Sequence, residues 1–450
     1  MSAISRSSAQ RAGPHAVRPV AAGPSTGARW ATILVAGALA LLLPSWHELS
    51  ILVSDGYMTL YAGRFIAHHG IPHHEVFTLA ARGRPWVDQQ WLAQLIEYEA
   101  WGAGGYVGLG LLNALAIAGG YAGLAAICLR RGASAVMTLV GCLLAVVFST
   151  TSMFIRAQDL TFPLFSALLA VCLTDSESEA PGWRIILTVP ILVLWANLHG
   201  SVLLAAGLIA LYLGYRAAIM SRRGNLSAAR RYGLLALLAA LAPLATPYGL
   251  HTISYYSDLI GNPAVARAAT EDGPPRLGAP GTYVAFAALT LAAAVLLVCA
   301  LRRQRVDRPL TALVLITAAA TIFACRNVVW LSMASAVYLA VAAREWIDSQ
   351  PPARGFVRIM SATAMVMVVL GAARLVAPPG GGYERDTPLR VIAAAARYAD
   401  AHPQARILGD NTTASALLWH EPQLDGHVVY DARLERYSAQ DIDAWVTYQL

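Results

Sequence analysis

Eleven apolar segments constrain this chain more than any other feature. A transmembrane helix needs roughly 20 apolar residues, and only 13% of the 450 residues are charged, about half the share of an ordinary soluble domain. A soluble globular protein is therefore excluded, and we expect an all-α polytopic membrane protein with about 11 transmembrane helices. The segments run at about 30–46, 105–129, 133–153, 157–173, 184–197, 200–216, 232–247, 282–301, 309–325, 328–345 and 357–377.

The basic residues predict the orientation of these segments. All 33 are arginines. With the N-terminus inside, 19 of them fall in inner segments, 7 in outer loops and 7 in the C-terminal tail, which is the bias expected for loops that stay in the cytoplasm. The net charge of +7 is thus explained by topology, and we expect no nucleic-acid partner. An odd number of spans places the tail outside.

Three regions follow along the chain. Residues 1–29 are rich in Ser, Ala, Gly and Pro and predict a disordered basic cytoplasmic arm. Residues 30–377 form the transmembrane domain, with a long first outer loop at 47–104 that contains an interfacial helix at 91–102. A second outer loop at 248–281 is rich in Gly and Pro.

The tail, 378–450, differs from the apolar spans because its sequence predicts short helices and strands. It predicts helices at 387–402, 412–420 and 437–449 and strands at 405–408 and 427–431. Strands alternating with helices indicate a small extracytoplasmic α/β layer, although two strands make a marginal sheet. The chain stops directly after a helix, which leaves open that this domain is incomplete here.

Two acids of the first outer loop are candidate catalytic groups. Asp55 follows directly on the first span, and Asp88 lies between Trp86 and Trp91. A carboxylate at a membrane surface beside apolar walls can have a raised pKa and act as a general base. A helix cap or a solvated loop acid is the alternative for each of them.

Four histidines of the same loop form the sequence HHGIPHH, at His68, His69, His73 and His74. They could bind a transition metal or hydrogen-bond a sugar or phosphate, but Gly70 and Pro72 favour a structural turn. The five cysteines lie in or beside apolar runs without metal-ligand spacing. We therefore expect no metal site, with a divalent metal as the alternative.

Several cations lie at the predicted outer boundary. Arg156 in FIRAQDLTF forms either an ion pair with Asp159 or a phosphate clamp. His199 in WANLHGS and Arg326 in ACRNVVW interrupt apolar stretches, where polar residues are costly. The candidate phosphate-binding set is Arg64, Arg156, His199, Arg326, His73 and His74. A carboxylate beside several cations at a lipid surface suits a substrate that is both lipid and phosphate.

The stretches SDGYMTLYAGRFIAHHGIP, GRPWVDQQWLAQL, WANLHG, RNVVWL and VVYDARLERY resemble the C-type (GT-C) integral-membrane glycosyltransferases, close to the RgtA/B/C/D-like group, over roughly residues 50–440. The resemblance implies a GT-C-like fold in the bacterial cytoplasmic membrane, a polyprenyl-phosphate-linked sugar donor, and a cell-envelope glycan or lipid acceptor on the outer face. Asp55 would be the base, and Arg156 and Arg326, with His199, would stabilise the leaving phosphate during inversion at the sugar. Characterised relatives often carry paired acids in this loop, whereas Gly56 follows Asp55 here.

Other functions remain as alternatives. A lipid or glycolipid transporter or flippase needs charges deep in several spans, whereas most charges here lie at span ends. A non-catalytic scaffold would bind a partner through its tail. A polymerase or ligase of lipid-linked glycans usually has its largest outer loop later in the chain.

Overall fold

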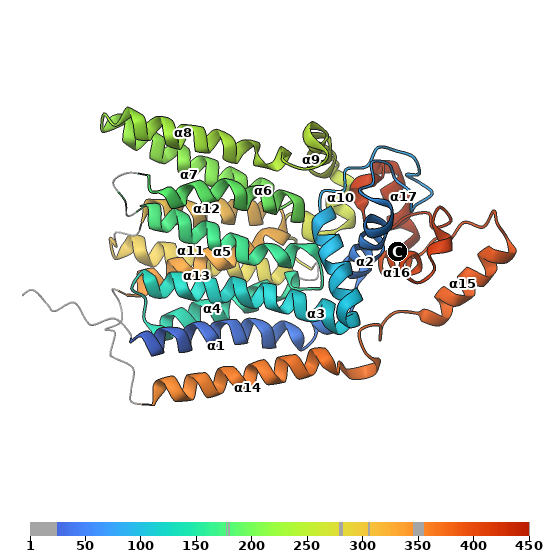
Figure 1. Ribbon diagram of the computed structural model, residues 1–450, viewed down its shortest axis with the longest axis horizontal. Helices are drawn as coiled ribbons and strands as arrows, with labels where there is room; N and C mark the ends of the chain where they lie inside the picture. The colour runs from blue at the N-terminus through green and yellow to red at the C-terminus, as the bar shows by residue number, and fades with distance from the viewer. Residues whose placement is uncertain are drawn as a thin grey trace, which may run out of the picture.

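A bundle of long helices, capped at one end by shorter ones, makes up the chain (Figure 1). The computed structural model describes residues 25–176, 178, 181–278, 282–304, 307–344 and 355–449. The predicted basic arm falls outside the described residues up to position 24, and α1 begins at Thr26, slightly earlier than expected.

Among the described residues, eight helices are long and apolar enough to cross a membrane. They are α1 (Thr26–Ser45), α3 (Trp91–Arg130), α4 (Ala135–Ser149) with η2 (Thr150–Ser152), η3 (Ala157–Thr161) with α5 (Phe162–Ser176), α7 (Val202–Arg222), α11 (Thr282–Leu301), η8 (Cys325–Asn327) with α13 (Val328–Ala343), and α14 (Phe356–Val376). The protein is thus an all-α, multi-pass membrane protein.

Three further apolar segments of the bundle are also helical. The segment Leu226–Leu244, made of α8 (Leu226–Leu241) and η5 (Ala242–Leu244), meets Gly249–Ile260 at a bend of 81° and would make a ninth span with it. The second half of this bent pair holds η6 (Gly249–His251) and α9 (Thr252–Gly261). The segment Trp183–Leu198, with η4 (Trp183–Leu187) and α6 (Thr188–Leu198), and α12 (Arg308–Phe323) are shorter. Each of the eleven expected segments is therefore helical.

The centre of the bundle is α13. Its first six residues are all buried, and it contacts α3, α4, α11 and α12. The ring of Trp330 lies 5.2 Å from Trp195 and 5.1 Å from Phe165, measured between ring centroids. Aromatic rings bury large areas and prefer such tilted contacts, so this cluster holds α5, α6 and α13 together.

The first outer loop is largely helical. It contains η1 (Glu48–Ser50), α2 (Ser54–His69) and the start of α3. The predicted interfacial helix is the first part of α3, which is kinked at Gly104 and Gly105. Gly105 has φ of 59° and ψ of −153°, a backbone conformation that only glycine adopts without strain. The kink lets the first part of α3 pack on α2 while the remainder enters the bundle.

The rest of the capping layer comes from the second outer loop and the tail. The loop holds α10 (Pro263–Ala268) and η7 (Thr270–Asp272). The tail holds η9 (Pro379–Gly381), α15 (Leu389–Ala401), α16 (Asn411–His420), η10 (Pro422–Leu424), η11 (Leu434–Arg436) and α17 (Ala439–Gln449). Helix α16 packs on α2, and α17 packs on α10.

The two strands expected in the tail are not formed in the described part of the chain. Ile407 and Val428 make a single isolated parallel bridge at the two expected places. Two strands of four or five residues give too few ladder hydrogen bonds to be stable alone. The tail is instead held by its helices, with Leu434, Ile442 and Trp445 in a small core shared with both outer loops.

Candidate active site

A cavity of about 1220 Å³ lies where the capping layer meets the bundle. It is larger than the ~300–1,000 Å³ typical of small-molecule sites. Its walls come from the start of α2, the segment between α4 and α5, the junction of α6 and α7, the second outer loop, the start of α13 and the tail. Four of the predicted site residues line it, namely Asp55, Arg156, His199 and Arg326.

Asp55 and Arg156 lie next to each other in the wall of this cavity. Asp55 lies in the first turn of α2, where a carboxylate is favoured by the helix dipole. Its Oδ2 is 3.6 Å from Nη1 of Arg156. Burial raises the pKa of Asp55 above its ordinary value, although the charge of Arg156 opposes the shift. A carboxyl with a raised pKa is a better proton acceptor near neutral pH.

Glu271 connects the two arginines. Its Oε1 lies 3.3 Å from Nη1 of Arg156 and 3.3 Å from Nη2 of Arg326. Arg326 also forms a close ion pair with Asp272. Burial alone would raise the pKa of Glu271, but the charges of Arg156 and Arg326 lower it to about 2. Glu271 is therefore ionised, and the arginines hold an anion between them.

Sequence reasoning missed Glu271 and Asp272. They belong to a Gly- and Pro-rich loop far along the chain from Arg156. The adjacent acids of the dipeptide Glu271–Asp272 were the only available signal.

The arginines keep free donor groups in the cavity wall. The Nε and Nη2 atoms of Arg156 and the Nε atom of Arg326 are buried, and none makes a hydrogen bond to the residues that the structure describes. The Nε and Nη2 atoms of one guanidinium form a planar fork that matches two oxygens of a phosphate. Because these atoms are buried, an anion in the cavity would reach them only after a local shift of the wall.

Asp159, the predicted alternative partner of Arg156, forms no ion pair with it among the described residues, although the two charges lie close enough to interact. It is fully buried, and neither carboxylate oxygen accepts a hydrogen bond within the described part of the chain. The ion pairs of Arg156 go instead to Asp55 and Glu271.

His199 contributes a neutral donor. The backbone N–H of Ser201 donates to Nδ1 of His199 at 3.1 Å, so the ring proton is assigned to Nε2. Burial lowers the pKa of His199 well below its ordinary value, and the nearby charges of Arg326 and Arg156 lower it further. The imidazole is therefore neutral at physiological pH and can donate one hydrogen bond.

The other predicted candidates do not line the cavity. Arg64 donates to the carbonyl oxygens of Leu418 and Trp419, each at 2.8 Å, and lies 4.7 Å from the centre of the Trp419 ring. It therefore anchors α2 to α16. His73 and His74 are exposed; the ring of His73 contacts Tyr248 at 5.4 Å, and His74 forms a bridge with Pro85.

Asp88 is buried beside the cavity without lining it. Its Oδ1 accepts a hydrogen bond from Nε2 of Gln94 at 2.9 Å. Burial raises the pKa of Asp88 to about 7. The neighbouring Gln90 lines the cavity in its place.

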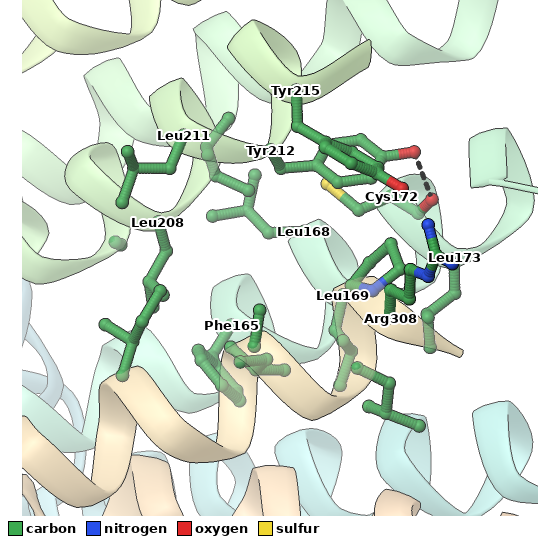
Figure 2. A pocket seen from close by; sticks show the side chains of 17 residues that line it. Phe165, Leu168, Leu169, Cys172, Leu173, Leu208, Leu211, Tyr212, Tyr215 and Arg308 are labelled. Carbon is green, nitrogen blue, oxygen red and sulfur yellow. Dashed lines mark hydrogen bonds between the residues drawn. The ribbon is translucent and has the colours of Figure 1, made fainter. Parts of the chain in front are cut away.

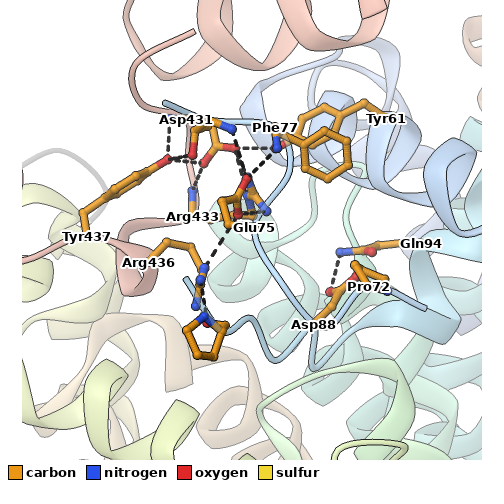
Figure 3. A network of polar contacts seen from close by, with 12 residues as sticks. Tyr61, Pro72, Glu75, Phe77, Asp88, Gln94, Asp431, Arg433, Arg436 and Tyr437 are labelled. Atoms are coloured by element: carbon orange, nitrogen blue, oxygen red, sulfur yellow. Dashed lines mark hydrogen bonds and ion pairs between the residues drawn. The ribbon is translucent and has the colours of Figure 1, made fainter. Parts of the chain in front are cut away.

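A buried ion-pair network fixes the tail against the first outer loop (Figure 3). Arg433 contacts Glu75 at 2.8 Å, and its Nε donates to Asp431 at 2.9 Å. Tyr61 and Tyr437 also donate to Asp431, at 2.8 and 2.9 Å. Arg433 and the nearby Glu435 line the cavity as well, so the tail is part of the site.

The fold and site define a multi-pass helical membrane protein with a charged cavity at one end of its bundle. No family model and no curated protein matches the chain. Among the residues that the structure describes, no group of three or more His, Cys, Asp or Glu side chains is arranged to hold a metal ion.

Proposed function

We propose that this protein is a GT-C-type glycosyltransferase of the bacterial cytoplasmic membrane. It transfers a sugar from a polyprenyl-phosphate donor to a cell-envelope glycan or lipid on the outer face. One observation carries the proposal: a carboxylate with a raised pKa and two arginines line one cavity. This combination suits a reaction in which a hydroxyl loses a proton while a phosphate leaves.

The cavity offers a path for the lipid part of the donor. Its lining includes Ile260 at the end of α9 and Ile322 and Phe323 at the end of α12. These three side chains are 55–64% exposed, although they are large and apolar. Exposed apolar groups beside a cavity mark a site for an apolar ligand. We propose that the polyprenyl chain lies along them and the phosphate against Arg156 and Arg326.

Asp55 acts as the general base in this mechanism. It takes the proton of the acceptor hydroxyl while the acceptor oxygen bonds to the anomeric carbon. The bond from that carbon to the phosphate oxygen breaks on the opposite face, and its electron pair leaves with polyprenyl phosphate, so the sugar inverts. The guanidinium groups of Arg156 and Arg326 stabilise the charge that develops, as preorganised donors do. His199 adds a neutral donor.

We propose that all eleven helical segments cross the membrane, with the N-terminus and the arginine-rich end inside. Arg130, Arg222 and Arg302 end or follow helices that run away from the cavity, which supports a cavity and tail on the outer side. Single cysteines introduced at Arg222 and at exposed Tyr398, in a background without the five native cysteines, test this with a membrane-impermeant thiol reagent. Only the cysteine at position 398 should react in intact cells; labelling of position 222 alone would reverse the orientation.

Binding of the donor's phosphate is tested by native mass spectrometry of the purified protein with a polyprenyl phosphate. Arg156→Ala is expected to weaken binding at least tenfold, the size of one charge-assisted contact. The matched control is Arg267→Ala, an exposed arginine that pairs with Asp443 and does not line the cavity. Equal affinity in wild type and Arg156→Ala would contradict the proposed phosphate site.

Transfer is tested with polyprenyl-phosphate sugars and an extract of cell-envelope acceptors. Asp55→Asn should abolish transfer and retain polyprenyl-phosphate binding, because the amide keeps the shape but cannot accept the proton. Full activity in Asp55→Asn would refute the role of the base. Movement of lipid across the membrane of proteoliposomes without a covalent product would favour the alternative function, a lipid or glycolipid transporter. Adding EDTA to the same assay tests whether a divalent metal takes part.

A further inference from the structure

A second, smaller cavity lies within the bundle, away from the capping layer. It forms a groove of about 270 Å³ between α5, α7 and α12 (Figure 2). Leucines 168, 169, 208, 211 and 313 make up much of its apolar lining. The volume is below the ~300–1,000 Å³ of sites for compact small molecules. The groove is better matched to a thin apolar chain.

Only one end of the groove is polar (Figure 2). Arg308 begins α12 there, and Tyr212 and Tyr215 come from the second half of α7. From Tyr215 the lining continues along α7 to Ala205, ten residues or about 15 Å away. This is half of the ~30 Å hydrocarbon core of a bilayer, so the groove has the depth of one leaflet.

Two acids described near this polar end, Asp175 and Asp307, are already paired. Asp175 accepts hydrogen bonds from Tyr212 at 2.7 Å and from Tyr232 at 2.8 Å, and its carboxylate pairs with Arg216 at 3.2 Å. Asp307, next to Arg308, forms a close ion pair with Arg131. Neither of these two carboxylates pairs with Arg308.

Arg308 itself is exposed, and it forms no ion pair with any residue in the described ranges. The positive guanidinium at one end of this apolar groove, which is as deep as one leaflet, complements an anionic lipid. Anionic headgroups of the bilayer are attracted to basic residues at its surface. An acyl chain attached to such a headgroup would follow the leucines.

We propose that this groove binds an anionic glycerophospholipid from the leaflet at the arginine-rich end. One acyl chain fills the space between α5, α7 and α12, and the phosphate contacts Arg308. The proposed phosphate position at Arg308 lies at the opposite end of the bundle from the cavity that holds Asp55, whereas the apolar end of the groove, at Ala205 and Ile316, approaches the lining of that cavity along α7 and α12. It does not depend on the proposed transferase reaction.

A second copy of the chain is a weaker fit for the groove. A specific interface usually buries about 800 Å² on each partner, whereas this groove is narrow and presents one cation at one end. A single lipid molecule fits both the narrow apolar groove, through its acyl chain, and the cation at one end, through its phosphate.

The test is native mass spectrometry of the full-length protein in mixed phosphatidylglycerol and phosphatidylcholine. Wild type should retain phosphatidylglycerol roughly tenfold more strongly, as expected for one charge-assisted contact. Arg308→Ala should remove this preference. The matched control, Arg230→Ala, changes an exposed arginine of α8 that does not line the groove and should leave the preference unchanged.

A second variant tests the groove without altering charge. Ala312 lies in the lining and is exposed, so Ala312→Trp should fill the groove and reduce retention of both lipids. An unchanged lipid preference in Arg308→Ala would overturn the proposal, as would unchanged retention in Ala312→Trp. Dimers in place of lipid adducts, or retention of polyprenyl phosphate alone, would also overturn it.

Discussion

Replacing Arg433 by methionine should loosen the attachment of the tail to the first outer loop. The Arg433 guanidinium is buried, contacts the carboxylates of Glu75 and Asp431, and lies 4.5 Å from the centre of the Trp86 ring. Methionine keeps much of the apolar volume but leaves the buried carboxylate of Asp431 without its cation, and Glu75 with only the more distant Nε of Arg436, at 3.7 Å. Breaking a buried ion pair by removing one partner costs about 3–5 kcal/mol.

Hydrogen exchange measures this cost as the free energy of opening of the tail. A loss of 3–5 kcal/mol corresponds to a fall of roughly a hundredfold to a few thousandfold in amide protection, read on the buried residues Ala414–Trp419 of α16. Arg267→Met is the matched control, because Arg267 also joins an outer loop to the tail, at 2.9 Å from Asp443, but both side chains are about half exposed. Exposed pairs contribute about 0.2–1 kcal/mol, so protection should fall less than about fivefold.

The pH dependence gives an independent check. Burial would raise the pKa of Asp431, but Arg433 outweighs it and lowers the pKa below the ordinary value. In wild type the stabilisation is therefore present at neutral pH and is lost as the pH falls through that lowered pKa. In Arg433→Met the charge that most lowers the pKa of Asp431 is gone, although the hydrogen bonds from Tyr61 and Tyr437 remain. The pKa of Asp431 should therefore rise relative to wild type, and the stability difference between the variant and wild type should become smaller in acid. A protection loss below tenfold at neutral pH, or equal losses in both arginine variants, would refute this reasoning.

Three other substitutions probe the capping layer. Asp88→Asn removes a buried acid whose pKa is raised from 3.8 to about 7, a shift that destabilises the wild-type protein as the pH rises from about 4 to 7. Thermal unfolding should show that the variant is more stable than wild type by about 4 kcal/mol at pH 8, and by less at pH 5. Gly63→Ala places a methyl group against the carbonyl of Gln94 and should cost about 1–3 kcal/mol in thermal unfolding, whereas Gly102→Ala meets open space and should not destabilise. Arg64→Ala removes two hydrogen bonds to α16 and should lower amide protection in α16 about tenfold or more, measured by hydrogen exchange. Unchanged thermal unfolding in Asp88→Asn or Gly63→Ala, or unchanged exchange in Arg64→Ala, would contradict the contact that the substitution removes or strains.

Hydropathy and arginine placement were sufficient to predict the helical bundle. The expected segments are helical because apolar runs of this length have few other ways to satisfy their backbone in a bilayer. The same pattern brought Asp55, Arg156, His199 and Arg326 together, because alternating helices put their ends on one side of the bundle. Which of these segments cross the membrane, and in which direction, stays a prediction.

Topology could not predict how the capping layer folds. Arg64, Asp88, His73 and His74 were assigned to the outer side, but the side of a membrane does not specify which way a side chain points. Glu271 reaches Arg156 and Arg326 only through the three-dimensional packing of the second outer loop. In the tail, the apolar pattern at 405–408 and 427–431 was strand-like, yet in the described part of the chain these two segments form only the bridge between Ile407 and Val428, because two such short segments make too few ladder hydrogen bonds.

The tail is both a wall of the cavity and the segment that closes it. Arg433 and Glu435 line the cavity, while the guanidinium of Arg433 is bound by Glu75 of the first outer loop. Asp55 begins α2 of that same loop, and Tyr61 of α2 donates to Asp431. A change that releases the tail therefore removes part of the cavity wall and a support of the helix that carries Asp55. The geometry of the candidate site consequently depends on a network that lies outside it.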